Sequence, residues 1–133
     1  MRGKWVGAAL AGAVVMLMTS VAAADMMHPR LAARLSGMGE HGIVNFESKA
    51  TAGKLCWTFE LGTKGVTGAT IRDAHGMIVV ALGKTYRSKA CAQVKPAALR
   101  LIEEKPGAYR VWVATKGHPG DLRGKLFVGM AHM

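Results

Sequence analysis

The stretch Tyr109–Leu126, YRVWVATKGHPGDLRGKL, carries the pattern that decides the fold of this chain. It predicts a β-hairpin, because two strand-like segments flank a tight turn at 116–120 that contains Gly and Pro. The second strand opens on an Arg-Gly pair. Since side chains alternate between the two faces of a strand, positions 109, 111 and 113 are expected to face the core. Arg110 and Trp112 are then expected to face outward.

The sequence before this hairpin also has the pattern of β-strands, from Gly42 onward. Its clearest period-2 run lies at 55–61, where Leu, Trp, Phe and Leu alternate with Cys, Thr and Glu. Further strands are expected at 42–46, 66–73, 77–82 and 87–94, joined by glycine-containing turns. The segment 77–82 is almost wholly apolar, which is expected of a strand covered on both faces.

Two segments are not plainly β-strands. Leu31–Leu35 has apolar residues at the spacing of a helix and also at that of a strand, and its residue propensities favour a short helix. The other segment is expected to be helical, because Pro96 suits the first helical position, good helix formers follow, and Pro106 ends the segment. Its apolar residues are expected to cover an open end of the core; they are Ala98, Leu99, Leu101 and Ile102. Glu103–Glu104 is expected to be solvated.

Together these segments predict an all-β fold. It is an antiparallel β-sandwich or barrel of about seven to eight strands, with one short helix near 96–105. Too few residues have a helical pattern for repeated β-α-β units, so an α/β architecture is excluded.

The N-terminal residues 1–24 are identified as a signal peptide. Arg2 and Lys4 form a cationic head, Trp5–Val21 is an uncharged apolar run, and Ala22–Ala24 supplies a small-residue cleavage site. The alternative is a retained membrane anchor, because the run approaches the length of a bilayer span. Cleavage makes the mature protein periplasmic or secreted, without a transmembrane anchor.

Removal of this leader leaves 109 of the 133 residues, which is enough for one domain with a single core. The expected organisation is a lead-in with a candidate first strand at 25–40, then a β-domain at 41–129 whose start can lie near residue 30. Taking the two leader cations from the 18 basic residues leaves 16 against 8 acidic ones, a formal charge of +8. Such a charge attracts anionic partners such as lipopolysaccharide, acidic glycans or nucleic acid. The alternative is simple solubility, because the Lys and Arg residues are scattered and form no basic run.

The two cysteines, Cys56 and Cys91, both lie in the exported part of the chain. An even count in an oxidising compartment predicts one disulfide, and no catalytic signature around either residue supports the alternative of a reactive thiol. Both residues have the parity opposite to the core residues of their strands. The bridge is therefore expected to join neighbouring strands on an outer face of the sheet.

The residue order of nearly the whole mature chain, from about Leu31 to Val128, resembles the chordin-type (CHRD) domain. The matching pieces are Leu35-Ser36-Gly37 with Glu40, Gly42–Phe46, Leu55–Phe59 with Leu61-Gly62, Val66–Ala69, Val79–Leu82, Lys89–Cys91, the Pro96–Pro106 stretch, Tyr109–Val111 and Gly120–Leu126. The resemblance implies an exported antiparallel β-sandwich similar in outline to the copper/zinc superoxide dismutase fold. It also implies a strand at Leu31–Leu35 and a Cys56–Cys91 pair. It implies no enzymatic activity for a stand-alone bacterial member.

The chain departs from this family where the family usually carries histidines. Thr70 and Arg72 stand at the positions of a His-x-His pair, and Ala114 stands at the position of another His. A His-x-His pair on a strand directs both imidazoles to one face and can chelate a metal. These three residues cannot, so that role of the family's histidines is expected to be lost here.

Catalytic and zinc-binding patterns are missing from the sequence. It contains no G-x-S-x-G elbow and no Ser/His/Asp arrangement, so we expect a non-enzyme without a cofactor. His75 follows Asp73 at same-face spacing, while His41 and His118 are isolated. A zinc site needs three or four convergent ligands, and no such cluster is visible.

The two ends of the mature chain suggest copper as an alternative. Thioether and imidazole ligands suit Cu(I), and the weak candidate ligands are Met26, Met27, His28, Met130 and His132. They form a site only if the termini approach each other. The alternative is two tails that happen to contain these residue types.

The closing hairpin offers a candidate binding face. Trp112 and Arg110 could stack on a sugar or engage an anion, and the candidate face adds Arg123 and Lys125 from the partner strand. The alternative is that Trp112 packs under a loop or under the Pro96–Pro106 segment. The expected function is a non-catalytic binding or structural module of the cell envelope. Its partner would be an unknown protein or an anionic envelope component rather than a specific nucleic acid, and periplasmic copper binding is the alternative.

Overall fold

The computed structural model describes residues 30–116 and 118–132. Eight strands form one antiparallel sheet in the order β5-β4-β7-β8-β1-β2-β3-β6. The strands are β1 (Arg30–Gly37), β2 (Glu40–Lys49), β3 (Lys54–Leu61), β4 (Val66–Arg72), β5 (Ile78–Ala81), β6 (Lys89–Gln93), β7 (Arg110–Thr115) and β8 (His118–Val128). The helical elements are η1 (Ala50–Ala52), α2 (Pro96–Glu104) and η2 (Pro106–Ala108).

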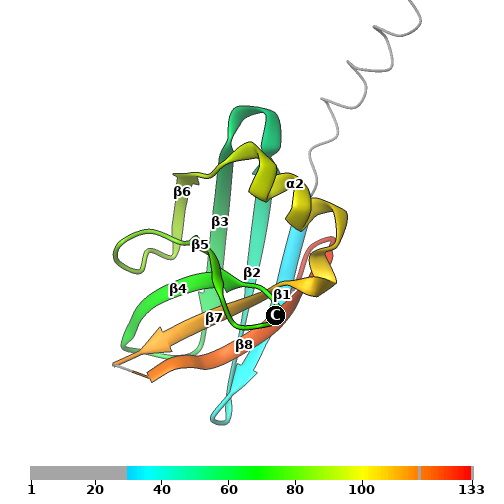
Figure 1. The fold of residues 1–133 in the computed structure, drawn as a ribbon. Helices are drawn as coiled ribbons and strands as arrows, with labels where there is room; N and C mark the ends of the chain where they lie inside the picture. The colour runs from blue at the N-terminus through cyan, green and yellow to red at the C-terminus, as the bar shows by residue number, and fades with distance from the viewer. Residues whose placement is uncertain (1–29, 117, 133) are drawn as a thin grey trace, which may run out of the picture.

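The sheet curls on itself and encloses the hydrophobic core on its concave side (Figure 1). Alternating residues of nearly every strand point into this core, because the period-2 pattern places apolar side chains on one face. The largest fully buried side chains include Leu31, Leu55, Ile71, Val111 and Leu126. The predicted all-β class, the strand number and the short helix are confirmed, and the strands form one continuous curled sheet.

The first strand begins at Arg30 and contains the ambiguous segment Leu31–Leu35. This segment is a strand rather than the short helix that its propensities favour. It pairs with β2 on one side and β8 on the other, so tertiary pairing outweighs the weak local preference for helix.

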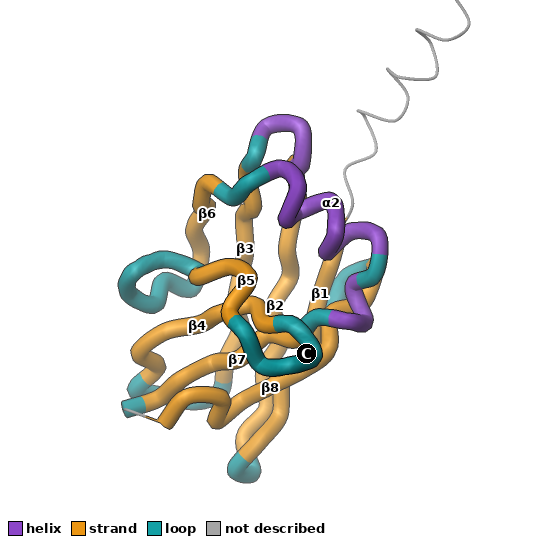
Figure 2. Tube along the Cα trace, in the orientation of Figure 1, coloured by secondary structure: helices purple, strands orange, loops and turns teal. Residues whose placement is uncertain are grey.

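The helical segments gather at one end of the curled sheet (Figure 2). Leu99 and Ile102 of α2 are buried in the main core, as predicted. Leu101, however, is exposed, and Glu103 is not solvated as expected. The Oγ of fully buried Ser48 donates a hydrogen bond of 2.5 Å to Oε2 of Glu103, which ties α2 to β2.

The apolar segment at 77–82 is not covered on both faces. Only Ile78–Ala81 is a strand, and it lies at the edge of the sheet. Val80 and Leu82 are buried, whereas the side chains of Met77 and Ile78 are 67% and 56% exposed. The expectation fails because an apolar composition does not distinguish a central strand from an edge strand that keeps apolar residues on its outer face.

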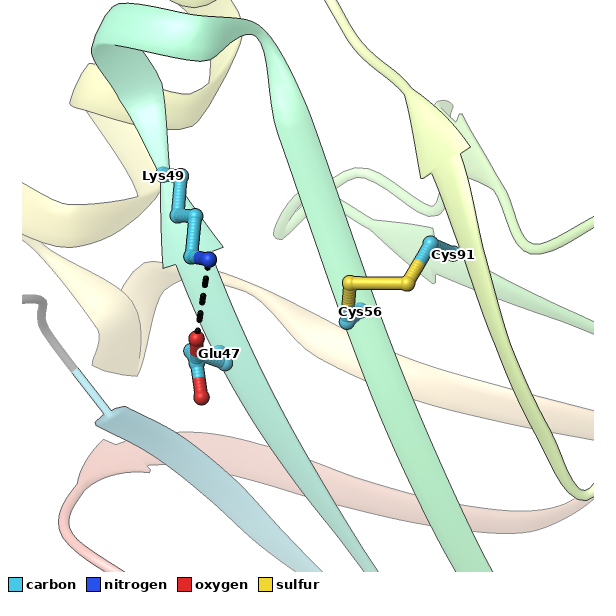
Figure 3. Close-up of a disulfide and its surroundings, with 4 residues drawn as sticks. All are labelled: Glu47, Lys49, Cys56 and Cys91. Atoms are coloured by element: carbon cyan, nitrogen blue, oxygen red, sulfur yellow. Dashed lines mark ion pairs between the residues drawn. A yellow bond between two sulfur atoms is a disulfide. The ribbon is translucent and has the colours of Figure 1, made fainter.

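The predicted disulfide joins Cys56 of β3 to Cys91 of β6 (Figure 3). The two residues are direct cross-strand partners, and both lie on the outer face of the sheet, between core positions such as Leu55 and Trp57. The parity prediction is therefore confirmed. The bridge links edge strand β6 to the rest of the sheet.

The expected signal peptide at 1–24 and the candidate copper ligands Met26, Met27 and His28 lie outside the described residues. Within the described part of the chain, no helix has both the length and the apolar character needed to cross a membrane.

Candidate functional site

The candidate binding face lies on the outer side of three neighbouring strands, β4, β7 and β8. Strand β7 pairs with β4 on one side and with β8 on the other. Val111 and Val113 are fully buried, so the residues between them point away from the core. The structure thus brings Arg110 and Trp112 together with Arg123 and Lys125, and it places Arg72 of β4 beside them.

These outward side chains form two rows that run across the strands. In one row Arg110 is the direct partner of Arg72 on β4 and of Lys125 on β8. In the other row Trp112 is the direct partner of Thr70 on β4 and of Arg123 on β8. We call the first set (Arg72, Arg110 and Lys125) the cationic row. The cationic face is this row together with Trp112 and Arg123.

Trp112 is the centre of the face and is half-buried. The Cζ atoms of Arg72 and Arg123 each lie 4.2 Å from the centroid of its ring. The turn after β4 also lies beside the ring, because a Cβ placed on Gly76 would come 3.9 Å from Cη2 of Trp112. Trp112 therefore packs under this turn and its own arginines, and it does not offer an open ring for a sugar to stack on.

The indole nitrogen Nε1 of Trp112 is buried and has no hydrogen-bond partner among the described residues. A buried N–H group without a partner costs about 1–3 kcal/mol. Trp112 is thus held by cation–π contacts and packing rather than by its polar atom.

Two hydrogen bonds fix the position of the guanidinium of Arg72. Its Nε donates to Oγ1 of Thr70 at 3.0 Å, and its Nη1 donates to the carbonyl oxygen of Gly76 at 3.3 Å. These bonds hold the group over Trp112 and leave Nη2 without a partner in the described part of the chain. A rigid guanidinium with a free donor suits binding of an anion.

Arg72, Arg110 and Lys125 form no ion pair with a carboxylate within residues 30–116 and 118–132, and Glu47 on β2 pairs instead with Arg30 and Lys49. The carboxylates near the face are engaged elsewhere. Oδ1 of Asp73 accepts hydrogen bonds from the backbone N–H groups of His75 at 2.9 Å and Met77 at 3.0 Å. Asp121 accepts a hydrogen bond from Oγ1 of Thr115.

A shallow cleft of about 220 Å³ borders the face on the side of β4. It is lined by Trp112 and Arg72 and, from the loop after β5, by Lys84. Thr70, Arg72 and Ala114 all line this cleft. The lining of the cleft therefore combines two cations, Arg72 and Lys84, with the indole ring of Trp112.

A second, larger groove of about 480 Å³ lies on the outer face of β2, β3 and β6. Met130, Ala131 and His132 line it together with Arg30 and the disulfide. The C-terminal segment is held there by Asn45, whose side chain donates to the carbonyl oxygen of Ala131 at 3.1 Å and accepts from its N–H at 2.8 Å.

The described ends of the chain lie side by side at this groove. The N–H of Gly129 donates to the carbonyl oxygen of Arg30 at 2.9 Å. Of the five copper candidates, Met130 and His132 therefore border the same groove as Arg30, and the remaining three precede Arg30 closely in the sequence.

The isolated histidines do not assemble into a site in the described residues. Asp73 binds the backbone N–H of His75 rather than its imidazole, so the two do not form a ligand pair. No three His, Cys, Asp or Glu side chains gather in the arrangement of a metal centre anywhere in the described part of the chain.

Sequence reasoning missed Arg72 and Lys84 as members of this surface. The alternation at 66–73 already places Arg72 outward, next to inward Ile71, but the pairing of β4 with β7 joins residues far apart in sequence and leaves no local signal. Comparison of the sequence with protein-family models and with curated proteins finds no match.

Proposed function

We propose that this protein is an exported, non-catalytic binding module of the cell envelope that holds an anionic envelope component on its cationic face. The observation that carries the proposal is the convergence of Arg72, Arg110, Arg123 and Lys125 around Trp112 on one side of the sheet. Scattered in the sequence, these cations form one patch in the fold. Such a patch attracts anions and steers them toward the surface.

The geometry favours an anion over a neutral sugar. Stacking on Trp112 would require a ligand to displace Arg72 or Arg123 from the ring. An anion instead contacts the outer N–H group of Arg72 while both guanidiniums remain on the ring. The guanidinium of Arg72, held in this way, keeps Nη2 as a donor for carboxylate, phosphate or sulfate oxygens.

Export to the periplasm or beyond is part of the proposal. The signal-peptide pattern at 1–24 supports it, and the Cys56–Cys91 disulfide agrees with an oxidising compartment. We also propose membership of the chordin-type domains, which rests on residue order along the mature chain. The curled antiparallel sheet is compatible with that membership.

Charge reversal on the face tests the proposal. Arg110→Glu with Lys125→Glu exchanges one pair of like-charged cross-strand partners for another. Lys95→Glu with Arg100→Glu makes the same change in net charge at exposed positions in and before α2. Binding is measured for the full mature chain against anionic vesicles, lipopolysaccharide and an acidic polysaccharide.

The face variant is expected to bind at least one of these ligands at least about 10-fold more weakly than the native protein, because the interaction depends on local charge. The control variant is expected to keep most of the affinity. Equal losses in both variants would show that only net charge matters, and the cationic face would be discarded as a site.

Periplasmic copper binding is a second candidate, favoured by the hydrogen bond that joins Arg30 to Gly129. It places Met130 and His132 next to the point where the sequence continues back to His28, Met27 and Met26. Soft thioethers with imidazoles are Cu(I) ligands. Copper content after purification without an affinity tag tests it: stoichiometric copper that disappears in Met130→Leu with His132→Asn supports the site, and metal-free native protein eliminates it.

A further inference from the structure

We propose that the anionic component is a lipid surface, and that Met77 and Ile78 insert among its acyl chains while the cationic face binds its headgroups. The inference rests on the proposed function, because it assigns the ligand class of the same face. It adds two apolar residues that the function so far leaves unexplained. We call Met77 and Ile78 the apolar pair.

The apolar pair lies at one end of the cationic row. Ile78 of β5 is paired with Arg72 at the register shift that follows Ile71, so the exposed Ile78 lies next to the first cation of the row. Across four neighbouring strands the paired residues are therefore Ile78, Arg72, Arg110 and Lys125, with Ile78 at the edge of the sheet. Met77 precedes Ile78 in the turn, where its backbone is fixed by Asp73.

Both side chains of the apolar pair are well exposed. Met77 is 67% exposed and Ile78 56% exposed, and they adjoin each other where the turn after β4 enters edge strand β5. Exposed neighbouring apolar side chains rimmed by polar groups mark contacts with proteins or membranes. Here the rim is cationic, which matches the anionic headgroups of a bilayer rather than an apolar protein patch.

The cationic row favours a surface with many charges over a single small anion. Strands lie about 4.8 Å apart, so the three cations span about 10 Å across the strands. Like charges directly opposite each other on neighbouring strands destabilise a sheet. A layer of headgroups can place an anion near each cation at once and remove this repulsion.

The turn that carries Met77 is rigid enough to present the pair. Asp73 binds the N–H groups of His75 and Met77, its own N–H bonds the carbonyl oxygen of Met77 at 3.0 Å, and Arg72 bonds the carbonyl oxygen of Gly76. The apolar pair and the first cation of the row are thus tied into one unit. An acidic glycan would use the cations but would gain nothing from the apolar pair.

The experiment distinguishes the contribution of the apolar pair to binding from the contribution of the positive charges. The variant Met77→Ser with Ile78→Thr removes apolar area, leaves the charges intact and keeps a β-branched residue in β5. Leu101→Ser is the matched control, because Leu101 on α2 has the same 56% exposure as Ile78. Co-sedimentation is measured for the full mature chain with phosphatidylglycerol vesicles and with phosphatidylcholine vesicles, and calorimetry with a soluble polyuronate.

We expect the native protein to bind phosphatidylglycerol vesicles and not phosphatidylcholine vesicles. The Met77/Ile78 variant is expected to bind at least about 10-fold more weakly, because partial burial of two apolar side chains is lost, while Leu101→Ser binds as the native protein does. Binding to the polyuronate is expected to be weaker than to the vesicles and the same in all three proteins.

Vesicle binding that is unchanged by the Met77/Ile78 substitutions would overturn the lipid inference and leave the cationic face in place. Stronger binding to the polyuronate than to the vesicles would also overturn the lipid inference, and it would identify acidic glycans as the ligand of the cationic face. If Arg110→Glu with Lys125→Glu leaves binding to every anionic probe unchanged, the proposed function itself fails. The two failures are therefore distinguishable.

Discussion

Trp112 links the stability of the outer face to its binding chemistry. Its ring is shared by Arg72 and Arg123, each with its Cζ 4.2 Å from the ring centroid, while its Nε1 has no hydrogen-bond partner in the described residues. Each exposed cation–π contact contributes about 0.5–1 kcal/mol. The ring therefore stabilises the face as a flat surface that orients two guanidiniums, whereas its unpaired N–H group contributes nothing favourable.

Substitution of Trp112 separates these two roles. Trp112→Phe keeps an aromatic face and is expected to lower the free energy of unfolding by only about 1 kcal/mol. Trp112→Ala removes the support of both arginines and is expected to cost about 2–3 kcal/mol and to weaken anion binding. Urea unfolding and vesicle binding check both changes. If Phe proves as damaging as Ala, the indole N–H has a role that the geometry does not assign to it.

Gly124 of the Arg-Gly pair is required for the close approach of β8 to β1. A Cβ at this position would lie 2.0 Å from the carbonyl oxygen of Arg34, so either strand would have to move. Gly124→Ala is expected to lower the free energy of unfolding by more than about 2 kcal/mol. Gly107→Ala is the control, because a Cβ there meets no described atom within 4 Å. Urea unfolding that gives equal stability for the two variants would contradict this account of the pair.

At the scale of elements, edge strand β6 depends on the disulfide more than the central strands do. It has five residues, pairs only with β3, and has alternating half-buried and exposed side chains. Cys56 and Cys91 are 35 residues apart, and closure of such a loop stabilises a folded chain by about 3–4 kcal/mol in the entropic treatment. The bridge sits on the outer face, so its removal leaves the core residues Leu55 and Trp57 in place.

Replacement of both cysteines by serine is therefore expected to give a folded protein with a weakened edge. The free energy of unfolding should fall by about 2–4 kcal/mol. Amide hydrogen exchange should accelerate in β6 more than in β1 or β8, because β6 opens locally. Uniform acceleration across the sheet would show that the bridge supports the whole fold rather than this edge.

The strand pattern could be predicted from sequence, whereas strand neighbours could not. Alternation at 55–61 and 109–115 locates β3 and β7 and correctly assigns their inward and outward residues, including both cysteines. The pairing of β4 with β7 joins segments about forty residues apart and carries no local signal, so the sequence alone does not place Arg72 beside Trp112. The edge position of β5 was hidden for the same reason. The helical pattern at 96–105 does not predict the partial burial of Glu103, because that burial depends on the tertiary contact with Ser48.

At the scale of the molecule, folding gathers basic residues that are far apart in the sequence onto one face of the sheet. The basic residues are spread along the chain without a run, which alone favours simple solubility. Folding brings Arg72, Arg110, Arg123 and Lys125 from three strands onto one face, with Met77 and Ile78 at its end. The groove lined by Met130 and His132 lies on a different part of the outer surface, over β2, β3 and β6. Because the two surfaces are separate, an experiment that locates a bound ligand can assign it either to the cationic face or to the groove of Met130 and His132.

Mapping of the contact surface by nuclear magnetic resonance tests the central claim most directly. The labelled mature protein is titrated with small anionic phospholipid bicelles, and with neutral bicelles as the control. The account predicts that amide shifts concentrate in β4, β7, β8 and the turn that carries Met77, only with the anionic lipid. Shifts centred on the groove of Met130 and His132, or shifts equal for both lipids, would contradict it.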